Sequence, residues 1–441
     1  MQTSLRGIAN KARKDKKYRF ANLYTMLNEM NLHYCWKFVN KKAVAGVDKV
    51  TARDYEKNLP EHISNLVERL KRKSYRANLV LRKWIPKSKD KKRPLGLPVI
   101  EDKLLQTCVA KILEAIFDGD FFDFSFGYRQ NHGPRQAALT LKEKIHRGRF
   151  RCLVEADIKG FFNNIDHDWM IKMLQQRIND KAFLRLITKW LKAGILEEDG
   201  KIVHPIVGTP QGGVVSAVLA NIYLHYALDL WFDKVVKKHC RGMVYLCRFA
   251  DDFVCLFELQ TDAERFYEAL PKRLAMFNLE LSMEKTNLIS FSRFLESAGS
   301  SFEFLGFEYR WGTSRKGKRI VLLRTSTKKF RQSLARFTEW IRTNRSKRVR
   351  RLLKTLNSKL RGYYNYYGVI NNFKSIDKYY RMVRRILFKW LNRRSQRKSF
   401  NWKQFDALLI RHNIEKPRIT QRDNGQLNFA FNQADSGSEY P

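Results

Sequence analysis

In RFADDFVCLF, residues 248–257, two adjacent aspartates interrupt runs of apolar and β-branched residues. Asp251 and Asp252 fall between the strand-like halves of MVYLCRFADDFVCLFEL (243–259), which predicts a hairpin with both carboxylates at its tip. Charged side chains rarely enter such runs unless they are paired or bind a metal. The pair alone is ambiguous, because Asp-Asp in a hairpin turn is common and usually structural.

A third carboxylate is placed in a similar way, in RCLVEADIKGFF (151–162), a predicted strand that ends at a glycine. Strand alternation puts Val154, Ala156 and Ile158 on one face and Glu155 with Asp157 on the other. Asp157 lies 94 positions before the first aspartate of the hairpin, so only tertiary structure could bring the carboxylates together.

If neighbouring strands do so, three carboxylates converge, and their mutual repulsion favours a bound cation. Mg²⁺ prefers such oxygen ligands, and two Mg²⁺ ions about 3.5–4 Å apart form the clamp used for in-line displacement at phosphorus. Mn²⁺ is a possible substitute. The glycine-rich GTPQGG (208–213) and the basic KSKDKKRPLGLP (87–98) are suited to backbone approach and to a triphosphate, although each is weak alone.

The charge of the chain indicates a polyanionic partner. Lys and Arg number 86 against 43 acidic residues, for a net charge of +43, and residues 311–420 hold 32 basic and 4 acidic side chains. Such an excess is best offset by nucleic acid. Tyr, Phe and Trp interleave with this charge, which is typical of base stacking, although we expect about half of them to be core.

Other features of the sequence limit the class of protein. The six cysteines show no C-x-x-C spacing, so no zinc site is indicated. Neither a signal-like N-terminus nor an uninterrupted apolar run of about 18 residues is present, so we expect a cytoplasmic, nucleoid- or RNA-associated protein. Residues 1–40 read as a basic amphipathic helix with Phe20, Leu23, Met26 and Met30 in its stripe, and residues 325–411 as helical. Residues 78–99 read as two strands joined by a charged turn, and residues 214–236 as a long buried helix.

Taken in order, seven motifs resemble those of the reverse transcriptases encoded by group II introns. They are IPKSKDKKRPLGLP (85–98), SFGYRQNHGPRQA (125–137), VEADIKGFFNNIDHDWM (154–170), VGTPQGGVVSAVLANIYLHYALD (207–229), RFADDFV (248–254), LELSMEKTNLISF (279–291) and FEFLGFEY (302–309). The helical stretch around KLRGYYNYYGVINNF (359–373) resembles the maturase domain of the same proteins. Seven motifs in order make chance agreement negligible, which no single motif would do.

The resemblance implies an α+β, right-hand polymerase with fingers, a palm built on a small antiparallel sheet, and a thumb, followed by a helical maturase domain. The implied divisions are a basic extension with the start of the fingers (1–77), fingers (78–150), palm (151–310), thumb or maturase domain (311–412) and a polar tail (413–441). The reverse transcriptase domain would run over about 78–310. Implied partners are template and intron RNA, DNA primer and target, and deoxynucleoside triphosphates; the oligomeric state stays open.

The resemblance also implies roles for single residues. Asp157 and Asp251 would ligate both metals, Asp252 would complete the acidic cluster, and Ile158 counts with the metal-binding positions. The nucleotide would be bound by Lys87 and Arg93 at the triphosphate, Gln211 along the base and template, Phe162 as the gate against a ribose 2′-hydroxyl, and Lys285 as a proton donor to pyrophosphate. Phe249 and Gly306 would contact primer and template.

Three departures and two alternatives accompany this interpretation. Phe249 replaces the Tyr of the family's Tyr-Ala-Asp-Asp, GYRQNHGP departs from Gly-Phe-Arg-Pro, and no Cys/His-bearing endonuclease domain follows, so second-strand cleavage is not expected. The first alternative is an RNA-binding splicing maturase with a vestigial polymerase, which loss of a carboxylate would favour. The second is a polymerase domesticated for DNA repair or phage defence.

Overall fold

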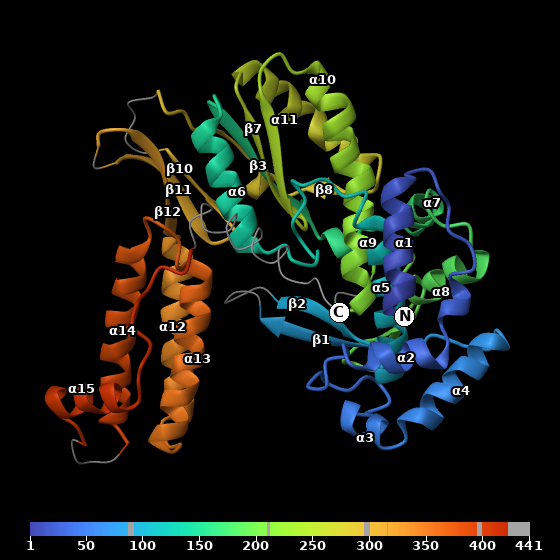
Figure 1. Ribbon diagram of the computed structural model, residues 1–441, viewed down its shortest axis with the longest axis horizontal. Coiled ribbons are helices and arrows are strands. Elements are labelled where there is room, and N and C mark those ends of the chain that lie inside the picture. The colour runs from blue at the N-terminus through green and yellow to red at the C-terminus, as the bar shows by residue number, and fades with distance from the viewer. Residues whose placement is uncertain (87–91, 210–211, 295–299, 315, 395–398, 422–441) are drawn as a thin grey trace, which may run out of the picture. The chain divides into compact units, whose positions relative to one another are not determined.

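The computed structural model describes residues 1–86, 92–209, 212–294, 300–314, 316–394 and 399–421 (Figure 1). The chain forms two compact units. Unit 1 contains residues 1–137 and 149–289, and unit 2 contains residues 138–148 and 290–441. The long helix α6 (Pro134–Arg147) begins in unit 1, and its remainder belongs to unit 2.

The apolar stripe predicts one helix over the N-terminal forty residues, but the structure does not form one there. Helix α1 (Gln2–Lys14) ends at Asp15, whose carboxylate accepts hydrogen bonds from the backbone N–H groups of Lys17 and Tyr18. Phe20 then forms a β-bridge with Ile178, and α2 (Glu29–Trp36) begins only after Asn28 caps it. Asp and Asn side chains that form hydrogen bonds with nearby backbone groups compete with the helix. The apolar stripe therefore predicted the wrong structure here.

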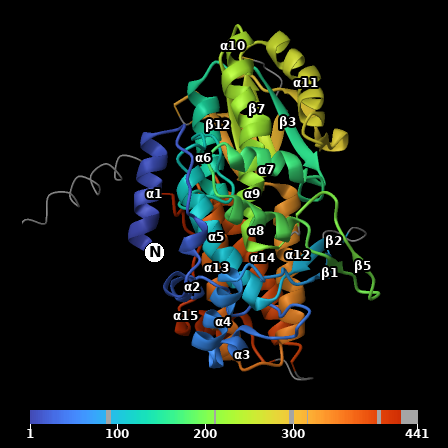
Figure 2. The ribbon, with the colours of Figure 1, turned by 90° about the vertical axis from the view of Figure 1, so that its right-hand side faces the viewer.

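An antiparallel sheet forms the centre of unit 1, in the order β6-β7-β3-β8, with β9 also pairing with β3. Helix α11 packs against β3, β7 and β8, as Figure 2 shows. The strands and this helix are β3 (Cys152–Lys159), β6 (Val244–Phe249), β7 (Asp252–Phe257), α11 (Gln260–Ala275), β8 (Glu280–Leu281) and β9 (Asn287–Ser290). This is the small antiparallel sheet expected of a palm.

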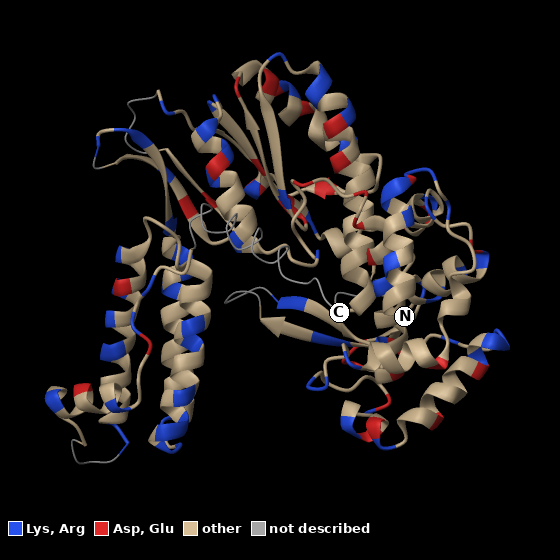
Figure 3. Ribbon diagram, in the orientation of Figure 1, with Lys and Arg blue, Asp and Glu red and all other residues tan. Residues whose placement is uncertain are grey.

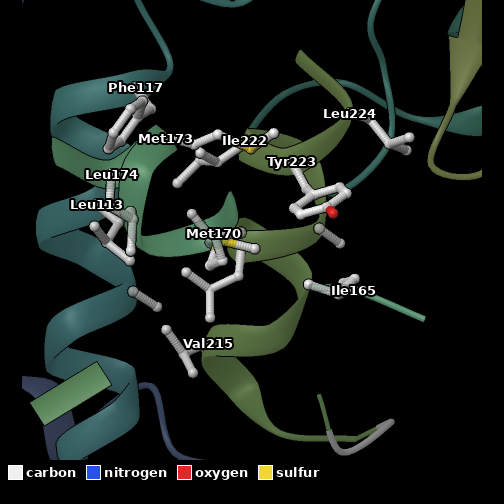
Figure 4. Close-up of a cluster of buried hydrophobic side chains, with 14 of the residues drawn as sticks. Leu113, Phe117, Ile165, Met170, Met173, Leu174, Val215, Ile222, Tyr223 and Leu224 are labelled. Atoms are coloured by element: carbon white, nitrogen blue, oxygen red, sulfur yellow. The ribbon is translucent and has the colours of Figure 1, made fainter. Parts of the chain in front are cut away.

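Helices make the core beside this sheet, and α5 packs against α9, which also contacts α7. Figure 4 shows their apolar side chains meeting: Leu113 and Phe117 of α5, Met170, Met173 and Leu174 of α7, and Val215 and Ile222 of α9. The helices of this part are α3 (Ala52–Lys57), α4 (Leu59–Lys71), α5 (Ile100–Phe117), α7 (His167–Gln175), α8 (Lys181–Leu191), α9 (Val214–Leu224) with two π-helical turns (His225–Asp229 and Phe232–Val236), and α10 (Lys237–His239).

The run from Val214 to His239 is long and apolar enough to cross a membrane by length and composition, and it is the one such helix in the described part of the chain. In this structure 72% of its apolar window is buried inside the protein. It is therefore a core helix here, which agrees with the buried helix that the sequence predicts at this place.

A second sheet of unit 1 has the order β2-β1-β4-β5. Its two longer strands, β1 (Val80–Pro86) and β2 (Lys92–Leu97), pair antiparallel as the sequence predicts, and β4 (Ile195–Leu196) and β5 (Ile202–Val203) complete it. The charged turn between the longer strands lies outside the described residues. Lys87 is in that turn, so its prediction is not addressed by the structure.

In its described residues, unit 2 combines a three-stranded antiparallel sheet with the remainder of α6 and with four further helices, as expected for a helical region after residue 325. Its elements are β10 (Ser301–Phe304), β11 (Phe307–Thr313), β12 (Arg319–Thr325), α12 (Thr327–Asn344), α13 (Val349–Tyr367), α14 (Phe373–Leu391) and α15 (Trp402–Arg411). Residues 413–421 then return along α13, where the N–H of Thr420 donates to the carbonyl of Gly368 at 2.8 Å. The rest of the polar tail lies outside the described residues.

Candidate active site

The paired aspartates lie where the sequence places them, at the tip of the β6–β7 hairpin. Phe249 and Asp252 face each other in the register, which leaves Ala250 and Asp251 as the two turn residues. Ala250 has φ of +58°, an uncommon conformation for a residue with a Cβ. Such local strain persists only where the surroundings fix the backbone, and it is common at functional sites.

Strand β3 brings Asp157 to the hairpin. Asp157 lies directly opposite Asp252 in the antiparallel β3–β7 pair, and such partners have Cβ atoms about 4.5–5.5 Å apart. The alternation is as predicted, since Val154, Ala156 and Ile158 are buried while Asp157 is half-buried. Ile158 therefore turns its side chain into the core, so any contribution of this position to a metal site would have to come from its backbone.

The electrostatics of Asp252 reflect this crowding. Burial, followed by the charges of Asp157, Glu155 and Asp251, raises the pKa of Asp252 from 3.8 to about 7, and Lys285 opposes the rise. A hard cation relieves such repulsion, so these oxygen donors fit a divalent ion such as Mg²⁺. Within the described ranges, however, no three Asp, Glu, His or Cys side chains already form a metal-binding group.

Lys285 offsets part of the negative charge of these carboxylates. It lies in a 3₁₀ turn (Met283–Lys285) after β8, and its ammonium forms an ion pair with the Asp157 carboxylate. The N–H of Ser282 donates to the carbonyl of Asp157 at 2.8 Å and fixes this turn beside β3. The resemblance implied a place for Lys285 near the reacting phosphates, and the structure brings it to the carboxylates of the predicted site.

A buried ion pair beneath the hairpin was not predicted. Arg248 and Asp229 are both fully buried and joined by two hydrogen bonds, one of them from Nε to Oδ1 at 2.7 Å. The same guanidinium donates to the carbonyl of Ala250 at 3.1 Å and to the hydroxyl of Ser125 at 2.6 Å. It therefore connects the Ala250–Asp251 turn to the loop of residues 125–130. The only sign of this ion pair in the sequence was an arginine inside the apolar run, because its partner Asp229 lies 19 residues away.

The glycine-rich loop lies beside the strand-to-turn segment that follows Asp157. A Cβ at Gly208 would lie 2.7 Å from the carbonyl oxygen of Asn163, and one at Gly212 would lie 2.7 Å from that of Gly96 in β2. The N–H of Thr209 donates to the carbonyl of Phe162 at 2.8 Å. The loop thus packs between the predicted gate and the strand that carries Arg93. Gln211 itself lies outside the described residues.

Arg93 and Phe162 also come to the site, and Tyr128 joins them. Tyr128 meets the Phe162 ring edge-to-face with centroids 6.4 Å apart. Burial and the charge of Asp251 raise the pKa of the Tyr128 phenol, and Arg93 lowers it, so the phenol lies within electrostatic reach of both. No role was predicted for Tyr128 beyond its place in GYRQNHGP, a departure from the family pattern.

Gly306 belongs to unit 2, and the local backbone conformation explains why a glycine occupies this position. With Leu305 it forms the two-residue turn between β10 and β11, and both residues have positive φ, +50° and +78°. A Cβ at Gly306 would lie 3.1 Å from the hydroxyl of Tyr367 and 3.3 Å from Lys329. A glycine is favoured here by the turn alone.

Comparisons with known proteins agree with this fold and site. The family described as "Reverse transcriptase (RNA-dependent DNA polymerase)" matches residues 85–309, about half of the chain. The family described as "Group II intron, maturase-specific domain" matches residues 327–406. The first match places the carboxylate cluster inside a reverse transcriptase domain, and the second places the basic helices of unit 2 inside a maturase domain.

Whole-chain relatives specify the family further. The chain is 31% identical to group II intron-encoded protein LtrA of Lactococcus lactis subsp. cremoris, over 81% of this chain and 72% of that protein. It is 28% identical to protein YkfC of Escherichia coli (strain K12), over 66% of this chain and 83% of that protein. It belongs to the group II intron-encoded reverse transcriptase/maturase family, whose reverse transcriptase domains generally use Mg²⁺. Its two domains indicate RNA and DNA as partners.

Proposed function

We propose that this chain is an active RNA-directed DNA polymerase, which copies RNA into DNA from deoxynucleoside triphosphates. The observation that carries the proposal is the acidic cluster, in which Asp157 lies opposite Asp252 and both lie beside the Asp251 turn. A vestigial polymerase would be free to lose these carboxylates. Instead, the chain keeps all three at a cost, since the charges raise the pKa of Asp252.

Asp157, Asp251 and Asp252 would hold two Mg²⁺ ions, which when bound would activate the primer 3′-hydroxyl and stabilise charge on the α-phosphate and the leaving pyrophosphate. The protein's part is to fix the carboxylates in place, and the strained Ala250 turn with its Arg248 contact supports this role. Lys285 would donate a proton to the leaving group, and the ion pair of its ammonium with Asp157 supports a position beside the reacting atoms.

Nucleotide selection would use the residues around the glycine-rich loop. Arg93, with Lys87 beyond the described part of β1, would bind the triphosphate, and Gln211 would lie along the nucleotide and template. Phe162 would pack under the sugar and exclude a 2′-hydroxyl by steric clash. Its carbonyl bond to the N–H of Thr209 supports a fixed backbone for this ring. Phe249 and Gly306 would contact primer and template.

Unit 2 would bind the intron RNA from which the family takes its name and would assist its splicing. Residues 311–420 carry 32 Lys and Arg against 4 acidic residues, and Figure 3 shows Lys and Arg positions in blue along the ribbons of α12, α13 and α14. Six of the interleaved aromatics in the described residues are buried, namely Phe337, Tyr363, Tyr364, Tyr367, Tyr379 and Phe405. Phe373 and Trp402 are exposed at 49% and 47%, which suits stacking on unpaired bases.

The experiment that tests this proposal is primer extension on poly(rA)/oligo(dT) with dTTP by the purified chain. Extension with Mg²⁺, loss of extension in EDTA and recovery on adding Mg²⁺ are the expected results. No extension under any divalent ion, with tight RNA binding retained, would contradict the polymerase and favour an RNA-binding splicing protein. Mn²⁺ tested beside Mg²⁺ would show whether it substitutes.

A further inference from the structure

The loop that carries Tyr128 is fixed to the catalytic hairpin. The N–H of Arg248 donates to the carbonyl of Phe124 at 2.8 Å, and the N–H of Phe126 donates to the carbonyl of Arg248 at 2.9 Å. At Gly127 a Cβ would lie only 2.2 Å from the backbone nitrogen of Ala250, so only glycine allows this approach. The loop and the hairpin are thus in direct backbone contact on the side of Tyr128 nearer the N-terminus.

The other side of Tyr128 is equally constrained. Arg129 is almost fully covered and donates to Asp118 at 2.9 Å and to the carbonyls of Phe122 and Ser125 at 2.9 and 2.8 Å. Asn221 also donates to the carbonyl of Gly127. Tyr128 therefore occupies a rigid position, and it does so with φ of +54°, a conformation that residues with a Cβ rarely adopt.

This strained position directs a large ring onto the predicted sugar gate. Phe162 lies in a short 3₁₀ turn (Phe161–Asn163), and two aromatic rings contact it within the described chain. One is its buried neighbour Phe161, and the other is Tyr128, which comes from 34 positions earlier in the sequence. Tyr128 is 46% exposed, so packing of its own ring does not account for the strain.

We propose that Tyr128 is a positioning residue for sugar selection: its ring supports Phe162 edge-to-face and keeps the Phe162 ring against the space that a ribose 2′-hydroxyl would need. The inference rests on the proposed function, because it assumes that Phe162 is the gate. A steric gate discriminates only as well as its ring is held, since a ring that can tilt admits the extra hydroxyl. The contact needs the aromatic ring of Tyr128 and not its hydroxyl.

The test is single-nucleotide insertion by the full chain, with dTTP and UTP compared for wild type, Tyr128→Ala, Tyr128→Phe, Phe162→Ala and the Tyr128→Ala/Phe162→Ala double variant. The readout is the ratio of kcat/KM for dTTP to kcat/KM for UTP, in which the amount of folded enzyme cancels. We expect Tyr128→Ala to lower this ratio about 3–10-fold and Tyr128→Phe to leave it within about twofold of wild type, as one edge-to-face contact implies. In the Phe162→Ala background, loss of Tyr128 should add no further change.

Two outcomes would overturn the inference. They are an unchanged ratio in Tyr128→Ala, including the case in which both nucleotides lose activity equally, and an effect of full size in the Phe162→Ala background. Failure of the gate itself looks different, because Phe162→Ala would then leave the ratio at the wild-type value. A Phe162→Ala effect without a Tyr128→Ala effect would retain the gate and remove only the support by Tyr128.

Discussion

At the residue scale, the pair formed by Arg248 and Asp229 determines how firmly the turn with the paired aspartates is held. Both side chains are fully buried, and the guanidinium also bonds to the carbonyl of Ala250. We predict that Asp229→Asn lowers the free energy of unfolding by about 3–5 kcal/mol, because it leaves a buried charge without its partner. Urea unfolding followed by circular dichroism would measure the loss.

Asp233→Asn is the matched control for that prediction. Asp233 follows one helical turn later and pairs with Lys234 and Lys237, whose side chains are 67% and 39% exposed. Pairs open to water contribute less than about 1 kcal/mol. Equal losses in the two variants would contradict the special importance of the buried pair.

The residues of the site differ in how far the sequence could predict them. Asp251 and Asp252 were predictable because charge inside an apolar strand pattern is costly and therefore informative, and Asp157 followed from alternation. Asp229 was not, because nothing in a helical run shows that a carboxylate faces an arginine from another element. Tyr128 was missed for a related reason, since its direction depends on a positive φ that no pattern shows in a residue other than glycine, Asn or Asp.

At the scale of elements, the β10–β11 turn gives a test of backbone conformation in unit 2. Gly306→Ala should lower the free energy of unfolding by about 1–2 kcal/mol, because alanine disfavours φ of +78° and its Cβ would crowd Tyr367. Gly362→Ala should instead raise it by about 0.5–1 kcal/mol, since Gly362 is inside α13 with no atom near its Cβ position. Urea unfolding of both variants is the measurement, and equal signs would contradict the account.

Helix α5 carries a carboxylate whose protonation should affect stability. Asp102 accepts from the hydroxyl of Tyr75 at 2.6 Å and from the N–H of Asn78 at 3.1 Å. Burial nevertheless raises its pKa from 3.8 to about 6. The folded chain therefore keeps a proton that the unfolded chain releases, so this group's stabilisation is present below pH about 4 and lost as pH rises through 6.

Asp102→Asn has no proton to lose. We therefore predict that its free energy of unfolding rises relative to that of wild type by about 3 kcal/mol between pH 4 and 7. Urea unfolding across this range would measure the difference between the two proteins. Asp199→Asn serves as the control, because its side chain is 56% exposed in a surface turn and should show no such trend. A difference that is constant with pH would contradict the assigned pKa.

Strands and helices were predicted well where one spacing of apolar residues dominated. They were predicted poorly where short polar residues interrupted that spacing. The β1–β2 hairpin, the strand ending at Gly160, the buried helix from Val214 and the helices after residue 325 all match. The N-terminal helix did not, because Asp15 and Asn28 bond to backbone and interrupt an apolar spacing that persists by coincidence. The π-helical turns after α9 were also not predicted.

At the scale of the whole molecule, the charge of +43 predicts how RNA affinity responds to salt. Each neutralised phosphate contributes about 0.7 to the slope of log affinity against log salt for single strands, so six to ten contacts give a slope of about −4 to −7. Replacing the exposed Arg351 and Lys354 of α13 by Ala should reduce its magnitude by about 1–2. Lys57→Ala, which removes a lysine paired with Asp54, is the control. A slope near zero would contradict phosphate binding.

The most direct test of the central claim compares wild type with Asp251→Asn in two assays on the same preparations. The account predicts that primer extension on poly(rA)/oligo(dT) falls by at least about 10³-fold, as expected when a group that acts on the reacting atoms is lost. RNA affinity should stay within about threefold, because the basic surface is untouched. Extension by Asp251→Asn at a rate near that of wild type would contradict the assignment of these carboxylates as the polymerase centre.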